Sequence, residues 1–301
     1  MIKTTSQANI APIAFAQVSR DLALLTKSRL SLSVVFSSIA GYILGSEVVV
    51  IQELVLLIVG GYGVAGAANA FNQIIERDLD AKMLRTQNRP LPSGRMKVGS
   101  AFLWACMFAI IGLVALYVIN PKTSMFAAIS MFLYTSVYTP LKSKTALAVF
   151  VGAFPGAIPF MLGWVAATGS FGLEAGTLFM IQFFWQFPHF WAIGWMMYDD
   201  YALAGINMLP TGKKDRGTAL QVILYTLWTI AISVTPALGI TGELSLSLVA
   251  AILVALCGLF MLVAAMRLFQ KRDTASAKRL LLISIAYISA IQIIYVIDKL
   301  L

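Results

Sequence analysis

The feature that most constrains this chain is a series of long apolar stretches separated by short polar segments. A helix needs about 20 apolar residues to cross a bilayer, and backbone groups in lipid must find their partners within their own segment. Charged residues make up only 12% of the chain, whereas a soluble domain carries roughly 25%. We therefore predict an all-α polytopic transmembrane helix bundle. About nine spans are expected, near residues 30–48, 52–74, 100–119, 122–140, 146–168, 174–197, 218–239, 245–266 and 280–297.

The distribution of basic residues predicts the orientation of this bundle. With a cytoplasmic N-terminus, only Lys122 and Lys299 of the 22 Lys and Arg residues fall outside the cytoplasmic segments. This bias follows the positive-inside rule and explains the net charge of +9 without a nucleic-acid partner. Residues 1–19 contain no evident cleavable signal peptide. We expect one integral-membrane domain over residues 1–301 with a cytoplasmic segment over 1–25. Its C-terminus would lie outside a bacterial-type plasma (inner) membrane, and any chemistry would face the cytoplasm.

Three oxygen-bearing side chains lie at the end of the second span, at helical spacing. Asn72, Glu76 and Asp80 are placed at i, i+4 and i+8, so they share one face of a helix. An amide carbonyl and two carboxylates are hard ligands that suit Mg²⁺, which usually keeps waters and bridges to substrate phosphates. The alternative is a solvated helix end, where these acids pair locally with Arg77 and Lys82. Both interpretations fit this segment when it is taken alone.

The residues that follow favour a binding site. Pro90, Pro92 and Gly94 stop the helix and form a shaped turn, which holds Arg85 and Arg89 near the acidic face. Guanidinium groups bind phosphate through paired hydrogen bonds. Carboxylates for a metal together with arginines for phosphate indicate a diphosphate site.

This segment resembles the signature of the UbiA-type intramembrane prenyltransferases, and more narrowly the branch that acts on protohaem. The resemblance implies transfer of a farnesyl group from farnesyl diphosphate to the 2-vinyl group of haem B, with addition of water. It also implies Mg²⁺ as cofactor, a lipid-accessible bundle, and haem A synthase or terminal oxidase assembly as a partner for the product. The matching residues are Asn72, Glu76, Asp80, Met83, Arg85, Thr86, Arg89, Pro90, Leu91, Pro92 and Gly94.

Two basic segments elsewhere are similar to family motifs. Tyr138 begins a Tyr-Thr-Pro-Leu-Lys segment between the fourth and fifth spans, in which Lys142 and Lys144 would neutralise the leaving diphosphate. Their alternative role is to set the topology. Lys27, in a Thr-Lys-Ser segment before the first span, is a further candidate for binding the substrate, as is Arg77.

The sixth span contains a run that is similar to the protohaem branch, Trp185-Gln-Phe-Pro-His189. His189 is the only histidine in the chain. It is interpreted either as structural or as a substrate contact that approaches the haem iron, approaches a propionate, or acts as a base near the vinyl group. The surrounding aromatic rings would line the chamber and stabilise a carbocation, or else pack in the core. They are Phe184, Trp185, Phe187, Phe190, Trp191 and Trp195.

A second acidic motif ends the sixth span. Asp199 and Asp200 are adjacent, so they cannot point the same way on a helix. We expect Asp200 to face the site as a fourth metal ligand beside Asn72, Glu76 and Asp80, and Asp199 to act indirectly on the substrate. The catalytic set is then completed by His189.

Two other functions fit part of the pattern. A prenyltransferase acting on a quinone precursor or another lipid would share the diphosphate site, but Trp185 and His189 favour protohaem. A secondary transporter would also carry intramembrane acids, yet these acids cluster at helix ends and not at the midplane.

Overall fold

The computed structural model describes residues 10–301, and the part it describes is helical with no strand. The elements are α1 (Ile10–Leu25), α2 (Ser28–Gly45), α3 (Ile51–Ile75), α4 (Arg77–Asp80), α5 (Val98–Ile119), α6 (Pro121–Phe132), η1 (Leu133–Tyr138), α7 (Thr139–Leu141), α8 (Ala148–Thr168), α9 (Leu173–Met196), α10 (Tyr198–Leu203), α11 (Arg216–Val234), η2 (Thr235–Leu238), α12 (Leu248–Lys271) and α13 (Thr274–Leu300).

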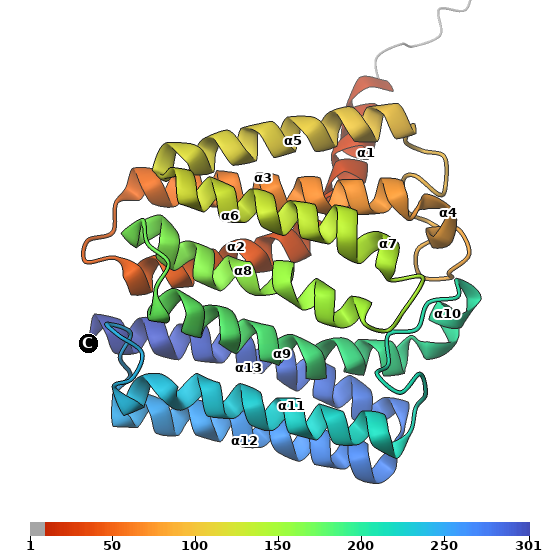
Figure 1. Ribbon diagram of the computed structural model, residues 1–301. Helices are drawn as coiled ribbons and strands as arrows, with labels where there is room; N and C mark the ends of the chain where they lie inside the picture. Colours follow the sequence, from red (N-terminus) through yellow and green to blue (C-terminus); the bar gives the residue numbers. More distant parts are fainter. Residues whose placement is uncertain (1–9) are drawn as a thin grey trace, which may run out of the picture.

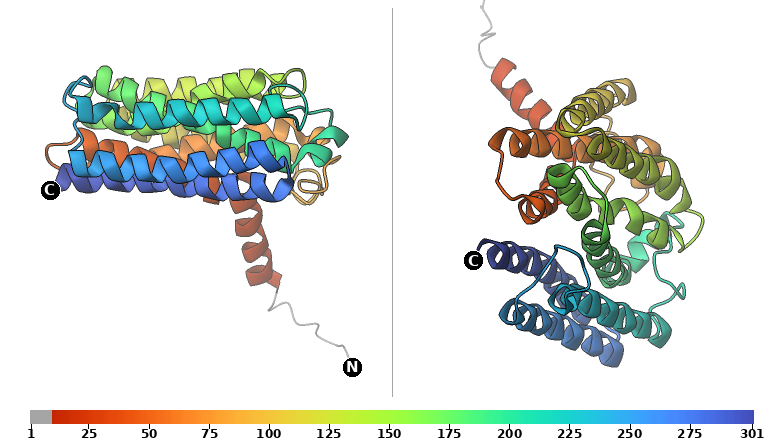
Figure 2. Two further views of the ribbon diagram at one scale, coloured as in Figure 1. Left: turned by 90° about the horizontal axis from the view of Figure 1, so that it is seen from below. Right: turned by 60° about the vertical axis from the view of Figure 1, so that its left-hand side comes forward.

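The long helices run roughly parallel and form one bundle, from which α1 points away (Figures 1 and 2). Seven helices among the described residues are long and apolar enough to cross a membrane, namely α2, α3, α5, α8, α11 with η2, α12 and α13. The other two expected spans correspond to stretches that are not among these seven. The run α6–η1–α7 is broken into short segments, and α9 is interrupted by polar residues such as Gln182, Gln186 and His189. The chain is an integral membrane protein.

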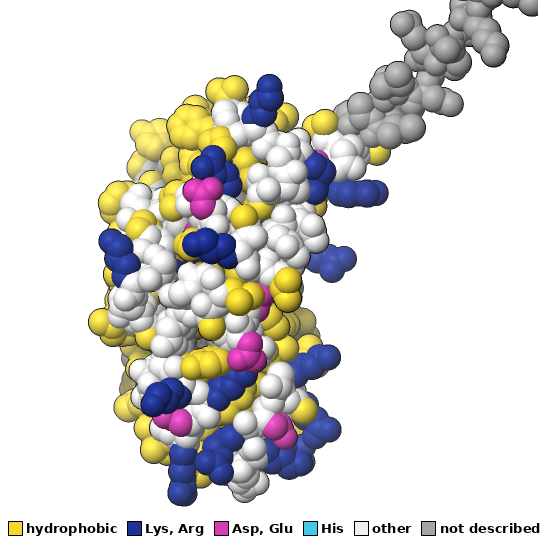
Figure 3. All heavy atoms as spheres, turned by 90° about the vertical axis from the view of Figure 1, so that its right-hand side faces the viewer, with side chains coloured by type: hydrophobic (Ala, Val, Ile, Leu, Met, Phe, Trp, Pro, Cys, Tyr) yellow, Lys and Arg dark blue, Asp and Glu magenta, His cyan; other side chains and the backbone are white. Residues whose placement is uncertain are grey.

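The outer helices present apolar side chains outward. Leu103 on α5 and Phe260 on α12 are 71% and 70% exposed, which is stable only where lipid replaces water. Lys and Arg side chains instead spread over the end of the bundle that carries α4 and α10 (Figure 3). We call this end the α4–α10 end.

Glycine allows a close helix contact between α2 and α8. A Cβ added to Gly163 would lie 1.9 Å from the Ser38 carbonyl oxygen, and one added to Gly41 would lie 2.0 Å from that of Phe160. Small residues drive membrane helices together because lipid provides no hydrophobic force between them.

Polar side chains also join neighbouring helices. Gln186 of α9 donates from Nε2 to the Ala153 carbonyl of α8 at 3.0 Å, and Gln182 Oε1 accepts from the backbone of Phe160 at 3.3 Å. Because a hydrogen bond in lipid has no competing water, these contacts fix α9 against α8. The same two glutamines border an internal cavity.

Candidate functional site

Asn72, Glu76 and Asp80 all point into the protein at the α4–α10 end, where they are 2%, 3% and 1% exposed. The helix breaks between α3 and α4, yet Glu76 N still donates to Asn72 O at 2.9 Å and Asp80 N to Glu76 O at 2.8 Å. The four-residue spacing therefore continues through the break. This common inward direction is what the sequence spacing predicts.

Each of the three side chains is held by a cation from another segment. Lys142 directly follows α7, and its Nζ lies 3.1 Å from Glu76 Oε2. Arg89 Nη1 lies 2.6 Å from Asp80 Oδ2.

Lys27 Nζ donates to Asn72 Oδ1 at 3.0 Å, while Asn72 Nδ2 donates to Thr139 Oγ1 at 3.1 Å. We call Lys27, Arg89 and Lys142 the cation cluster. It joins three regions of the chain that are separated by tens of residues.

Lys27 takes an unusual backbone conformation to reach the cluster. It lies between α1 and α2 with φ of 46°, in the left-handed region, which costs a non-glycine residue roughly 1–2 kcal/mol. Burial, together with the charges of Arg89 and Lys142, lowers the pKa of Lys27 to about 7. A polyanion such as a diphosphate would offset the repulsion within the cluster and favour the charged form of Lys27.

The segment after α4 is held in a defined shape. Arg95 donates to Asp21 Oδ1 of α1 at 3.1 Å, to Ser93 Oγ at 2.7 Å and to the Asn88 carbonyl at 3.0 Å. The turn that carries Arg89 is thereby tied to α1. The sequence positions of Asp21 and Arg95 do not predict this ion pair.

The two adjacent aspartates face different surroundings. Asp200 accepts from the backbone N–H of Leu84 at 2.9 Å through Oδ1, and its Oδ2 is buried with no hydrogen-bond partner among the described residues. The Asp199 side chain is 90% exposed and lies 3.5 Å from Lys214. Asp200 therefore faces the segment after α4 while Asp199 faces outward.

These carboxylates are not gathered into a formed metal site. Within residues 10–301, no group of three His, Cys, Asp or Glu side chains lies close enough to hold a metal ion. Two of the acids are occupied by cations, and Asp200 keeps one oxygen unpartnered. This donor set fits Mg²⁺ that arrives with a diphosphate, because Mg²⁺ usually takes only one or two carboxylates beside waters and phosphate oxygens.

Three basic residues expected near the substrate lie outside this cluster. Arg77 is exposed and pairs with Asp78 at 2.9 Å. Arg85 is exposed, with its guanidinium 6.0 Å from the Tyr201 ring centroid. Lys144 is exposed, with no ion pair among the described residues. Helix geometry explains the outward direction of Arg77. Arg77 directly follows Glu76, so its side chain points about 100° away from that of Glu76.

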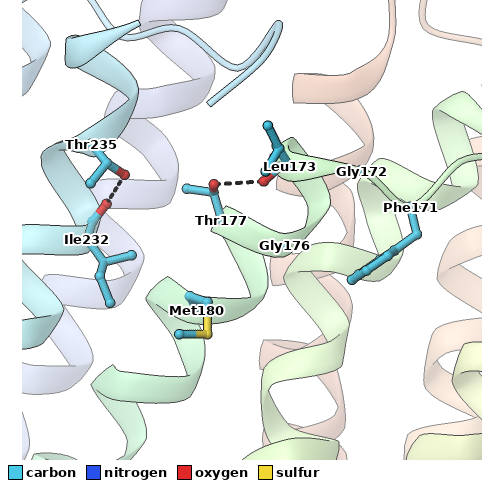
Figure 4. Close-up of a pocket in the computed structure, with 8 residues that line it drawn as sticks. All are labelled: Phe171, Gly172, Leu173, Gly176, Thr177, Met180, Ile232 and Thr235. Carbon is cyan, nitrogen blue, oxygen red and sulfur yellow. Dashed lines mark hydrogen bonds between the residues drawn. The ribbon is translucent and has the colours of Figure 1, made fainter. Parts of the chain in front are cut away.

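A cavity of about 500 Å³ lies within the bundle. It takes its walls from α2, α3, α6 with η1, α8, α9 and α13. Its lining includes Tyr134, Tyr138, Trp185, His189 and Phe190. A second pocket, also of about 500 Å³, lies near the opposite end between α9 and α11 and is shown in Figure 4. It contains no titratable side chain.

Tyr138 reaches the cavity because η1 is a π-helix. Its wider turn stacks Tyr138 on Tyr134, with ring centroids 5.3 Å apart, and the Thr139 hydroxyl donates to the Tyr134 carbonyl at 2.7 Å. Single π turns of this kind are frequent at functional sites. Sequence periodicity predicts a plain helix here.

The six aromatic residues of α9 have three different surroundings. Trp185 and Phe190 line the cavity together with His189. Phe187, Trp191 and Trp195 are buried in the core.

Phe184 instead packs against Tyr225 and Trp228 of α11, with ring centroids 5.8 and 6.0 Å away. Of the two interpretations of these six rings, lining the cavity holds for Trp185 and Phe190, and packing within the bundle holds for the other four. They are spaced around α9, and only one side of that helix faces the cavity.

Ser284 of α13 is a polar contact of this region that the sequence did not single out. Its Oγ lies 2.9 Å from His189 Nδ1, and its carbonyl accepts from Trp185 Nε1 at 2.7 Å. A lone serine in an apolar helix carries no motif, so only the three-dimensional contact reveals it.

A buried carboxylate and cation cluster at one end of a membrane helix bundle, next to an internal cavity, defines the class of this protein. Residues 34–290 match the UbiA prenyltransferase family, and the chain belongs to that family. The protoheme IX farnesyltransferase of Christiangramia forsetii is 62% identical over 284 residues, which cover 94% of this chain and 95% of that protein. The protoheme IX farnesyltransferase of Flavobacterium psychrophilum is 60% identical over 285 residues, with coverage of 94% and 95%.

Solved structures show the same fold at low sequence identity. A digeranylgeranylglyceryl phosphate synthase matches with a TM-score of 0.77 and 17% identity, over 93% of this chain and 98% of that one. A UbiA homolog from Archaeoglobus fulgidus, bound to GPP and Mg²⁺, matches with a TM-score of 0.68 and 14% identity, over 92% and 99%.

Proposed function

We propose that this protein is a protohaem IX farnesyltransferase, which transfers the farnesyl group of farnesyl diphosphate to the 2-vinyl group of haem B. The observation that carries the proposal is the cation cluster of Lys27, Arg89 and Lys142 beside buried carboxylates, in a chain about 60% identical to proteins of that name. The full chain acts as one membrane domain. Haem B and farnesyl diphosphate are substrates.

The reaction separates charge, and the site is arranged for that step. The bond between C1 of the farnesyl group and the diphosphate oxygen breaks, and its electron pair leaves with the diphosphate. Lys27, Arg89 and Lys142 bind the departing oxygens and stabilise their charge in a site of low dielectric. Asp200, Glu76, Asp80 and the Asn72 carbonyl would hold Mg²⁺ together with the diphosphate, and the ion would supply further charge neutralisation. Removing the substrate would return the carboxylates to their cations.

The farnesyl group and the haem then react in the cavity. The terminal vinyl carbon bonds to C1, a water oxygen bonds to the other vinyl carbon, and that water loses a proton. The products are haem O and diphosphate. The apolar walls exclude water from the allylic cation until it is captured, and the rings of Trp185 and Phe190, both in the wall, stabilise its positive charge.

The charge distribution supports a cytoplasmic active site. Lys and Arg side chains spread over the α4–α10 end, so we place it and the N-terminus at the cytoplasmic face of a bacterial-type inner membrane, with the C-terminus outside. A haem A synthase or the assembly of a terminal oxidase would receive the haem O.

A purified-enzyme assay tests the acceptor. The protein in lipid nanodiscs is incubated with farnesyl diphosphate, Mg²⁺ and either haem B or 4-hydroxybenzoate, and the products are identified by mass spectrometry. We expect haem B to gain the elements of farnesol and the phenol to stay unchanged. Prenylation of the phenol but not of haem would assign the protein to another branch of the family.

A further inference from the structure

The contacts of His189 and Ser284 are all satisfied when Nδ1 of the neutral ring carries the proton. Ser284 is fully buried and donates its single hydroxyl proton to the Leu281 carbonyl at 2.8 Å. Ser284 Oγ therefore accepts the hydrogen bond from His189 Nδ1, 2.9 Å away, because a hydroxyl has one proton and two lone pairs. Neutral His189 is then protonated at Nδ1, and Nε2 keeps a free lone pair.

That lone pair is open to the cavity. His189 lines the cavity, whereas its Nδ1 is turned to α13. Nε2 has no hydrogen-bond partner among residues 10–301. It is also not one of the fully buried polar atoms that lack a partner, so it is accessible. A lone-pair nitrogen facing an apolar chamber accepts a proton or binds a metal, and in this form it repels a propionate carboxylate.

The ring plane of His189 is restrained as well as its tautomer. Trp185 stacks on it with centroids 4.7 Å apart and planes at 28°. The Trp185 indole is itself fixed, because its Nε1–H donates to the Ser284 carbonyl at 2.7 Å. Ser284 thus orients both rings, through its hydroxyl and its backbone.

We infer that Ser284 is a positioning residue that presents His189 Nε2 as an axial ligand to the iron of the haem acceptor, an inference that rests on the proposed function. A histidine that binds a metal almost always donates its other ring N–H to a fixed acceptor, which sets the tautomer and the ring direction. The pair of Ser284 and His189 has this arrangement.

The position along α9 suits this role. His189 lies eight residues before Met197, the C-cap of α9, which is about 12 Å along the helix axis from the α4–α10 end. Iron bound at His189 fixes the depth of the porphyrin below the cation cluster, so the acceptor enters the apolar part of the cavity. Holding one reactant at a set depth converts an encounter in the membrane into a reaction between oriented groups.

Haem titration of the full-length protein in nanodiscs tests the inference. The wild type should show the absorption and electron paramagnetic resonance signature of histidine-ligated ferric haem, and H189A should lose it. S284A should weaken haem binding by about 10–100-fold, the usual effect of removing the partner of a metal-bound histidine, and should change the spectrum. S284T, which keeps the hydroxyl, should restore both.

Ser233 of α11 provides a matched control. It is also fully buried, accepts a side-chain hydrogen bond, from Tyr287 at 2.8 Å, and donates to a carbonyl one turn earlier, that of Thr229, at 2.7 Å. S233A therefore removes the same kind of contact without touching His189. Its haem spectrum should match the wild type even if its stability falls as far as that of S284A.

Two results would overturn the inference. One is an unchanged haem spectrum and affinity in H189A, which would exclude ligation by this residue even if turnover falls. The other is an S284A protein whose haem binding equals that of S233A. Neither result bears on the proposed function, which fails separately if the wild type forms no farnesylated haem in the mass-spectrometric assay.

Discussion

Removing Lys142 tests whether the cation cluster neutralises carboxylates until the metal and diphosphate arrive. Lys142 is largely buried against Glu76, which is 3% exposed. Breaking a buried ion pair from one side costs about 3–5 kcal/mol, because a desolvated charge is left without its partner. K142M should therefore lose that much stability in the absence of ligand.

The size of the thermal shift follows from the length of the chain. An unfolding entropy of about 2.1 cal/mol/K per residue gives roughly 0.6 kcal/mol/K for 301 residues. A loss of about 3–5 kcal/mol then lowers Tm by roughly 5–8 °C. Helices persist in detergent, which makes the unfolding entropy smaller and the shift larger, so these values are lower bounds. Thermal unfolding in detergent is followed by differential scanning fluorimetry.

Added Mg²⁺ should distinguish the loss of Lys142 from the loss of Glu76. In K142M the unpaired Glu76 carboxylate is free to bind a divalent cation, so millimolar Mg²⁺ should recover much of the lost Tm. In E76Q the unpaired group is a cation, and Mg²⁺ should recover nothing. R77M removes the exposed pair with Asp78 one residue further along, and should leave Tm close to that of the wild type. If Mg²⁺ stabilises K142M no more than R77M, the exchange of partners at Glu76 is wrong.

Three further predictions concern other parts of the structure. D200N keeps the acceptor for the backbone N–H of Leu84 but loses the charge, so kcat/KM for farnesyl transfer should fall by about 100-fold or more. D199N changes an exposed side chain and should keep kcat/KM within about twofold of the wild type. Equal losses in the two variants would contradict the assignment of Asp200 to the site. G163A should lower the unfolding free energy by at least about 1–3 kcal/mol because its Cβ meets the backbone of α2, and a normal Tm would show that the two helices separate easily. R95M should free the turn after α4 and raise KM for farnesyl diphosphate about tenfold, which corresponds to about 1.4 kcal/mol of lost binding free energy. An unchanged KM in steady-state kinetics would show that the turn does not contribute to substrate binding.

Hydropathy was enough to place most of the bundle. The span expected at 52–74 is α3 over Ile51–Ile75, and the span expected at 280–297 lies within α13. The expected span at 122–140 is instead divided by the π turn of η1. That turn depends on the contact between Tyr134 and Tyr138 and on the Thr139 hydroxyl, and a hydropathy window does not detect such contacts.

Periodicity also predicted the direction of the acidic side chains but not their partners. Four-residue spacing is local, so it shows that Asn72 and Glu76 share a face, and adjacency shows that only one of Asp199 and Asp200 points inward. The partners Lys27 and Lys142 lie 45 and 66 residues away from the groups that they hold. Such pairs depend on how helices pack, and a single sequence carries no local record of them.

The resting arrangement of the site has a consequence for the order of binding. A metal ion that arrives alone at Glu76 or Asp80 must displace Lys142 or Arg89 and leave that cation unpaired in a buried site. A diphosphate that arrives alone meets the carboxylates as well as the cations. When Mg²⁺ and diphosphate bind together, each carboxylate gains the metal as each cation gains a phosphate oxygen, and no buried charge is left unpaired. Binding should therefore be strongly cooperative, and calorimetry of the wild type should detect little heat from Mg²⁺ or diphosphate added singly. Tight binding of Mg²⁺ alone would mean that the carboxylates are not committed to their cations.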